Sequence, residues 1–195
     1  MGGNPPIKNH SIVNKIVSSR KIERIVIFTV YRENWEPYMK KYTEVFQSQF
    51  PHLITDYLLL DTEQIDFDSY LDADLIIIGG GNTEKYIATY VNQEFKNYID
   101  RMLNKGAKVK GFSAGALLLG EKVYVSPNDH SDHQIKIKKG LGLFSQFLIS
   151  VHYDSWNDKA NKDRAEELVN VPIIPLNDHS CLVLDKLGNI TEKID

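Results

Sequence analysis

Apolar and polar positions follow two different periods along this chain. Continuous apolar runs such as 24–30 (R-I-V-I-F-T-V) and 74–78 (D-L-I-I-I) are typical of strands that are buried on both faces. Between the runs lie segments with helical apolar spacing, of which 36–50 is an amphipathic example with Pro37 in its first turn. Strands that alternate with helices in this way predict an α/β fold, with a mostly parallel sheet and helices on both faces.

The same alternation continues to the end of the chain. We expect further strands at 57–61, 147–151, 171–176 and 181–185, and further helices at 92–104 and 158–170. The aromatic residues Tyr38, Tyr42, Phe46 and Phe50 recur at helical spacing, which is typical of a core-facing stripe. No repeat or low-complexity linker interrupts the pattern, so we expect residues 1–195 to form a single domain.

A triplet of glycines, 79–81, follows the apolar run 74–78 and precedes N-T-E-K-Y-I-A-T-Y. This order predicts a buried strand, a tight turn and a helix that Asn82 or Thr83 would cap. A phosphate-binding loop is an alternative, but the motif has neither the G-x-G-x-x-G spacing nor the Lys-Ser/Thr of a Walker loop. A plain turn without function is the other alternative.

Ser113 lies in a G-x-S-x-G frame within residues 108–120, between a short apolar strand and the apolar start of a helix. That context is the one that a nucleophile elbow requires. The flanking glycines, Gly111 and Gly115, would let the backbones pass closely, and free N–H groups at the helix start would face a developing oxyanion. Alternatively, Ser113 is a small residue that packs a strand against a helix.

A serine hydroxyl needs a base, and His152 is the best placed of the six histidines. It follows the apolar run 147–151, at the carboxyl end of a strand, and so on the same sheet edge as Ser113. The alternative is a core or rim histidine with a satisfied hydrogen bond. Asp129 and Asp132 are candidates for the carboxylate that orients the histidine. Asp154 is too near His152 in the sequence to face it readily.

The loop 125–133 (V-S-P-N-D-H-S-D-H) could also hold a metal ion, through His130, Asp132 and His133. A fourth ligand with suitable spacing is not evident, and zinc sites need ligands in fixed geometry. A solvated polar loop is the other interpretation. We therefore expect neither a metal nor a cofactor.

Four motifs together carry a resemblance: G-G-G-N-T, G-x-S-A-G-A, the N-D of the polar loop and the strand that ends in H-Y. From residue 1 to about residue 185 the chain resembles the dipeptidase E (aspartyl dipeptidase) and cyanophycinase family of serine peptidases. Members have a flavodoxin-like sheet related to class I glutamine amidotransferases. The resemblance implies a triad of Ser113, His152 and Asp129, with an oxyanion hole formed by Gly80 and the N–H of Ala114.

The resemblance further implies hydrolysis of short peptides, in the dipeptidase branch those with N-terminal Asp. Arg164 matches an arginine that binds the aspartyl side chain in that branch, and a guanidinium is a natural partner for a carboxylate. A solvated arginine paired with Asp163 or Glu167 is the alternative. The aromatic-rich stretch 152–159 departs from the dipeptidase pattern. Another acyl or amide hydrolase, such as a cyanophycinase-like enzyme, or a catalytically silent binding module is the competing function.

A second departure lies at the start, where M-G-G-N resembles the family's first glycine turn without the strand before it. The stretch after 181–184 is also brief. Three explanations are open for the edge strand. It is absent from the fold, it is supplied by a partner such as a second copy in a homodimer, or it was lost by truncation of the sequence.

Composition narrows the function classes. A net charge of -3 and a pI near 6.1 give no electrostatic footprint for nucleic acid. No apolar stretch is long enough for a membrane span, and no signal-peptide pattern opens the chain. The single cysteine, Cys181, excludes an internal disulfide and suits the cytosol. We expect a cytoplasmic hydrolase whose partner is a small peptide substrate.

Overall fold

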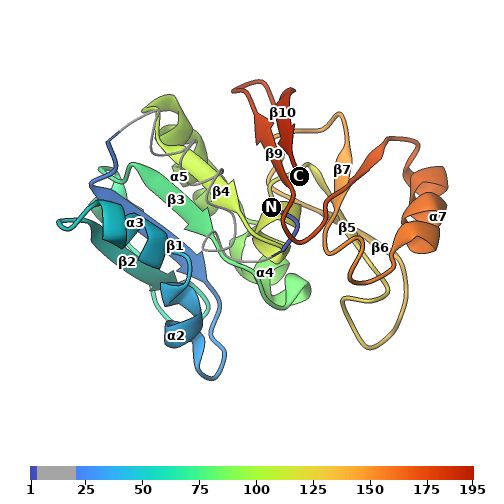
Figure 1. The fold of residues 1–195 in the computed structure, drawn as a ribbon, viewed down its shortest axis with the longest axis horizontal. Coiled ribbons are helices and arrows are strands. Elements are labelled where there is room, and N and C mark those ends of the chain that lie inside the picture. The colour runs from blue at the N-terminus through green and yellow to red at the C-terminus, as the bar shows by residue number, and fades with distance from the viewer. Residues whose placement is uncertain (4–20) are drawn as a thin grey trace.

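The computed structural model describes residues 1–3 and 21–195, and its centre is a four-stranded parallel sheet in the order β2-β1-β3-β4 (Figure 1). Its strands are β1 (Arg24–Thr29), β2 (Ile54–Leu59), β3 (Leu75–Ile78) and β4 (Lys108–Gly111). This order is the one found in flavodoxin-like sheets. It confirms the expected α/β fold.

Helices cover both faces of this sheet, as the apolar runs predict. They are α2 (Trp35–Lys40), α3 (Glu44–Gln49), α4 (Thr83–Tyr90) and α5 (Gln93–Asn104). Val26 and Phe28 of β1 pack with residues of α4 and α5, whereas Ile25 and Ile27 pack with residues of α2 and α3. Successive side chains of a strand point to opposite faces, so one apolar run supplies both cores.

The expected helix 36–50 is wrong in one respect, because the structure divides it into α2 and α3. Between them Tyr42 N–H donates to Met39 O at 2.9 Å and Thr43 N–H donates to Lys40 O at 3.0 Å, which are tighter turns than those of an α-helix. The Thr43 hydroxyl also donates to Lys40 O. A side chain that competes for a backbone carbonyl weakens the helix at that point.

The second half of the chain forms smaller sheets beside the central one (Figure 1). The parallel pair is β7 (Leu148–Ser150) with β8 (Ile173–Pro175), and the antiparallel pairs are β5 (Lys122–Val125) with β6 (Lys136–Lys139) and β9 (Cys181–Leu184) with β10 (Ile190–Ile194). The helices here are α6 (Ala114–Leu117) and α7 (Lys159–Val169), and a 3-10 turn, η2 (Phe67–Tyr70), precedes β3. The sequence pattern did not predict β5, β6 or β10.

Residues 1–3 lie between the central sheet and these smaller sheets, as the N label in Figure 1 shows. Met1 O accepts a hydrogen bond from Ser113 N–H at 3.0 Å. Gly2 N–H donates to Ser180 O at 3.1 Å, and Gly2 O accepts from His152 N–H at 3.0 Å. The first glycine turn therefore connects the ends of β4 and β7 with the segment before β9.

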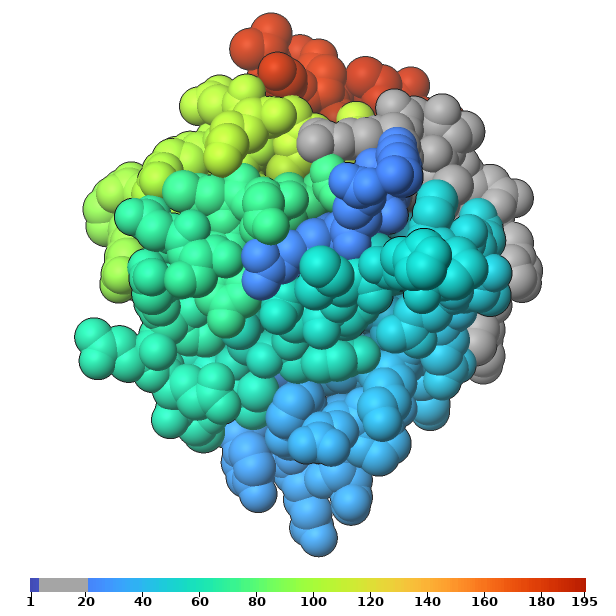
Figure 2. All heavy atoms as spheres, turned by 90° about the vertical axis from the view of Figure 1, so that its left-hand side faces the viewer, coloured from blue at the N-terminus to red at the C-terminus, as the bar shows by residue number. Residues whose placement is uncertain are grey.

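The face of the molecule at the β2 edge is formed mainly by the first half of the chain, and the C-terminal residues reach it only at the top (Figure 2). Among the helices of the described residues, none combines the length and apolar character that crossing a bilayer requires.

Candidate active site

The backbone turns sharply at Ser113, between β4 and α6. Its φ of 49° and ψ of -117° lie in a region that serine rarely adopts. The flanking glycines make this turn possible, because a Cβ at Gly111 would lie 2.3 Å from Gly115 O, and a Cβ at Gly115 would lie 2.2 Å from Ile78 O. The segment thus has the strained strand–turn–helix geometry of a nucleophile elbow.

The structure brings Ser113 and His152 together. Ser113 Oγ lies 2.8 Å from His152 Nε2, and His152 Nδ1 lies 2.5 Å from Asp178 Oδ1. This geometry lets the Asp178 carboxylate accept a hydrogen bond from the Nδ1–H while Nε2 accepts one from the serine hydroxyl. Serine, histidine and aspartate therefore form one continuous hydrogen-bonded chain, which is the arrangement that activates a serine nucleophile.

The expected acid, Asp129, forms no hydrogen bond with the histidine, and the carboxylate that the structure brings to His152 is that of Asp178. His152 follows β7, and Asp178 follows β8, which is the parallel neighbour of β7 with Ser150 opposite Pro175. The residues just beyond these two strands therefore meet at the same sheet edge. The sequence signal that could have found Asp178 is its place after the apolar run 171–176.

Asp129 instead lines the cavity into which Ser113 opens. Its Oδ2 is buried and has no hydrogen-bond partner among the described residues. Burial raises the pKa of the Asp129 carboxyl, against a smaller opposing effect of the Thr83 hydroxyl. A carboxylate held in this way is available to a cationic group of a bound molecule.

The other acidic and basic residues of that loop pair with one another. Asp132 lies 2.5 Å from His130 Nδ1 and 2.7 Å from Lys136 Nζ, and His133 Nδ1 lies 3.1 Å from Pro127 O. Within the described ranges no three metal-ligating side chains converge. Asp132 is therefore the partner of a surface network and does not reach His152.

The loop that carries His152 is anchored by packing and by a buried carboxylate. The His152 ring packs on Trp156 with 4.6 Å between the ring centroids. Asp158, which is fully buried, accepts hydrogen bonds from Ser150 Oγ at 2.9 Å and from Ser126 Oγ at 2.5 Å. It also accepts from Tyr124 Oη and Asn161 Nδ2. Asp158 thus ties the end of β5, which leads to Asp129, to the end of β7, which leads to His152.

The expected oxyanion donors are the backbone N–H groups of Ala114 and Gly80. In the described part of the chain, the Ala114 N–H has no hydrogen-bond partner and is free to donate. The Gly80 N–H donates to Tyr42 Oη at 3.3 Å, which is a long hydrogen bond. A substrate oxygen could displace the Tyr42 hydroxyl from Gly80.

The cavity has a volume of about 190 Å³ and includes Ser113, His152, Asp129, Gly80, Arg32 and Tyr42 in its lining. Tyr38 also lines it, so two of the aromatic residues expected only in the core contact the site as well. Arg164 does not line this cavity and is exposed on α7. The structure therefore does not bring Arg164 to the nucleophile.

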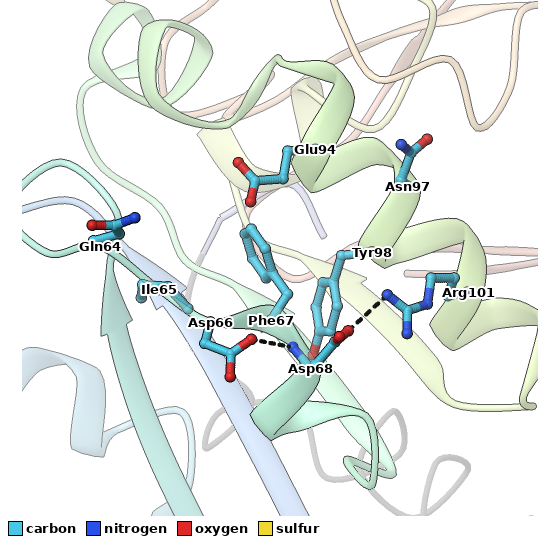
Figure 3. A pocket seen from close by; sticks show the side chains of 9 residues that line it. All are labelled: Gln64, Ile65, Asp66, Phe67, Asp68, Glu94, Asn97, Tyr98 and Arg101. Atoms are coloured by element: carbon cyan, nitrogen blue, oxygen red, sulfur yellow. Dashed lines mark hydrogen bonds and ion pairs between the residues drawn. The ribbon is translucent and has the colours of Figure 1, made fainter.

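A larger cavity of about 630 Å³ lies between η2 and α5 (Figure 3). Its charged side chains include an ion pair, Arg101 with Asp68 at 2.8 Å, and Asp66 accepts from the Asp68 N–H at 3.1 Å. Serine, cysteine and histidine are absent from the described residues that line it. The described lining of this cavity therefore supplies neither a serine or cysteine nucleophile nor a histidine base.

Comparison with known proteins yields a family match and two similar structures. The model of peptidase family S51 matches residues 17–189. A peptidase from an acI-B1 Actinobacterium superimposes with a TM-score of 0.68 at 18% identity, covering 93% of this chain and 80% of that chain. A protein assigned as a peptidase E from Listeria monocytogenes EGD-e has a TM-score of 0.68 at 18% identity, covering 98% and 94%. At this identity the likeness concerns the fold. No curated protein sequence matches the chain significantly.

Proposed function

The chain belongs to peptidase family S51, and from that premise we propose that it is a serine peptidase that hydrolyses short peptides, with Ser113, His152 and Asp178 as its triad. The observation that carries the proposal is the continuous contact from Ser113 Oγ to His152 Nε2, at 2.8 Å, and from His152 Nδ1 to Asp178, at 2.5 Å. The first contact is within the range that proton transfer requires, and the second places the carboxylate where it can orient the imidazole.

The proposed reaction is acyl transfer through a covalent intermediate. His152 takes the Ser113 proton as Oγ attacks the peptide carbonyl, and the resulting oxyanion accepts hydrogen bonds from the N–H groups of Ala114 and Gly80. His152 then gives the proton to the leaving amine, which breaks the peptide bond and leaves an acyl-enzyme. A water molecule, deprotonated by His152, hydrolyses the ester and restores Ser113. Asp178 holds the imidazole and stabilises its charged form in both steps.

The size and charge of the cavity favour a small zwitterionic substrate. At about 190 Å³ it lies below the usual range for ligand sites, so it suits a small molecule. The unpartnered Asp129 Oδ2 would bind the α-ammonium group of a peptide whose first residue occupies the site. We propose dipeptides as substrates, with N-terminal Asp as the preferred first residue.

Two measurements test this function. Ser113→Ala and His152→Ala should each lower kcat for Asp-Leu hydrolysis by about 10⁴-fold or more, and the double variant should be little slower than either, because triad members act as a unit. A fluorophosphonate probe should label the wild type at Ser113 and should not label Ser113→Ala. The control variant is Ser145→Ala, which removes an exposed serine and should be labelled as the wild type is. Independent, additive losses, or labelling that survives Ser113→Ala, would contradict the proposal.

A further inference from the structure

Arg32 is the only arginine or lysine among the described residues that line the Ser113 cavity. We propose that its guanidinium binds a carboxylate of the substrate and thereby sets specificity. This inference rests on the proposed peptidase function and deepens it. Its basis is that the Arg32 guanidinium lies in the same cavity as Ser113 and has no carboxylate partner among the described residues.

The Arg32 side chain has unsatisfied hydrogen-bonding capacity. Its Nε is buried and has no hydrogen-bond partner among the described residues, and none of their carboxylates lies within ion-pair distance of the guanidinium. Removing an N–H donor from water without an acceptor is unfavourable. A ligand carboxylate would supply that acceptor, in the bidentate geometry that suits a guanidinium.

The carboxylates near Arg32 are committed elsewhere or lie apart from it. Asp61 accepts the N–H of Tyr31, the residue before Arg32, at 2.9 Å, and pairs with Lys85 at 2.7 Å. Asp129 lines the same cavity but forms no ion pair with Arg32. The positive charge of Arg32 is therefore not neutralised by the described protein groups around it.

The backbone and an aromatic ring hold Arg32 in position. The Trp35 N–H donates to Arg32 O at 3.2 Å and closes a turn in which Asn34 adopts a φ of 57°. The guanidinium carbon lies 3.8 Å from the centroid of the Tyr38 ring, so the planar group stacks on that ring. A guanidinium ordered before binding loses little entropy when a carboxylate arrives.

Arg32 and Asp129 together present opposite charges to one small space. A dipeptide has a matching set, namely an α-ammonium group and one or two carboxylates. The carboxylate that Arg32 recognises has two sources, the side chain of an acidic first residue and the C-terminus of the second residue. Peptides that lack one or the other distinguish these sources.

The test measures kcat/KM for Asp-Leu, Asn-Leu and Asp-Leu amide with wild-type enzyme, Arg32→Gln and Arg32→Lys. Arg32→Gln should lower kcat/KM for Asp-Leu by about 100-fold, since it removes one partner of a charge pair. If Arg32 recognises the side-chain carboxylate, hydrolysis of Asn-Leu should be almost unaffected. If it recognises the C-terminal carboxylate, hydrolysis of Asp-Leu amide should be almost unaffected. The kcat/KM of Arg32→Lys for Asp-Leu should lie between those of the wild type and Arg32→Gln, because lysine keeps the positive charge but cannot form the bidentate contact of a guanidinium. Arg101→Gln, which alters an exposed arginine of the distant cavity, is the matched control.

Arg32→Gln that slows all three peptides by the same factor, or none of them, would overturn the inference, since a structural role would act on every substrate alike. Calorimetric binding of Asp-Leu to Ser113→Ala, with and without Arg32→Gln, separates the inference from the proposed function. Binding that depends on Arg32 without hydrolysis by the wild type would refute the peptidase and keep the carboxylate site. Hydrolysis with normal Ser113 labelling and no effect of Arg32 would refute only the inference. Neither binding nor hydrolysis of any of the three peptides would refute both.

Discussion

Asp178 is the residue on which the proposed chemistry depends most directly after the nucleophile and base. Its carboxylate contacts His152 Nδ1 at 2.5 Å, and Ser155 Oγ donates to it in a weaker contact at 3.4 Å. A carboxylate in this place fixes the tautomer in which Nε2 can accept the serine proton. An amide would favour the other tautomer.

Asp178→Asn should therefore lower kcat by about 10³- to 10⁴-fold with little change in stability. Asp129→Asn should instead raise KM, because Asp129 faces the substrate ammonium in our proposal. Steady-state kinetics with Asp-Leu measure both effects, and Asp154→Asn, at an exposed position of the same loop as His152, is the control. If Asp129→Asn were the variant with the larger loss of kcat, the acid would be Asp129 after all.

Lys110 is a second residue with a measurable consequence. It is buried in β4, and its amine has no hydrogen-bond partner among the described residues. Burial lowers the pKa of Lys110 from 10.5 to about 8, against a smaller opposing effect of Cys181. The folded state therefore binds this proton less tightly than the unfolded state does, and the cost of burying the charged amine is present in full below pH 8.

Lys110→Met should raise the free energy of unfolding at pH 7, by up to about 3 kcal/mol for a pKa lowered to this extent. The advantage should shrink as the pH rises from 8 toward 10.5, where the wild-type folded state has already released the proton. Urea denaturation at pH 7 and pH 10 gives the difference. Lys108→Met, an exposed position on the same face of the same strand, should show neither effect. A gain independent of pH would mean that packing, not charge, is responsible.

At the scale of elements, the chain is predicted best where local chemistry and tertiary packing agree. The helix start at Asn82 is an example, since its Oδ1 accepts from Lys85 N–H at 2.8 Å, as the capping pattern predicts. The break between α2 and α3 is the opposite case, because the apolar spacing continues through it. The apolar spacing does not register the Thr43 hydroxyl that competes for Lys40 O.

The candidate site residues also divide into those that the local sequence predicts and those that only tertiary contacts bring to the site. Ser113 and His152 are predictable because each stands next to a clear strand, and local glycine chemistry marks the first. Asp178 is not, because its contact with His152 depends on the pairing of β7 with β8, which lie more than twenty residues apart in the sequence. Arg32 is equally hidden, since only the folded sheet brings the end of β1 beside the ends of β3 and β4.

Asp158 connects the elements that lead to Asp129 and to His152. Asp158→Ala should lower the free energy of unfolding by about 3 kcal/mol or more, because it leaves several buried hydroxyl donors without an acceptor. Thermal or urea denaturation measures the loss, and Asp163→Ala, which removes a half-exposed carboxylate paired with Lys159 on the same helix, should cost less than about 1 kcal/mol. Equal losses for the two variants would show that the Asp158 network does not stabilise the fold.

At the scale of the whole molecule, the proposed triad spans two parts of the chain. Ser113 belongs to the central sheet, whereas His152 and Asp178 follow strands of the β7–β8 pair. Residues 1–3 lie where these parts meet. A Cβ at Gly3 would lie 2.5 Å from Asp178 Oδ1 and 2.8 Å from His152 Cε1, whereas a Cβ at Gly2 would lie 2.2 Å from the backbone oxygen of Asn177.

Substitution of Gly3 should therefore reduce activity, whereas substitution of Gly2 should reduce the stability of the fold. Gly3→Ala should displace the two side chains and lower kcat by about 100-fold, a typical cost of an error of about 1 Å in catalytic geometry. Gly2→Ala should instead destabilise the fold by about 1–3 kcal/mol, because backbone atoms cannot move aside cheaply. Kinetics and denaturation of both variants check the contrast. Full activity in Gly3→Ala would show that residues 1–3 do not constrain the triad.

The left-handed backbone at Ser113 has a consequence for how such a chain can change over generations. A residue held at this φ and ψ costs about 1–3 kcal/mol, and glycine adopts the same conformation without that cost. A copy of the chain relieved of any need to cleave peptides would therefore fold more stably once Ser113 became glycine. Without selection for turnover such a stabilising substitution would be retained, so selection for turnover is what keeps a hydroxyl at this strained position.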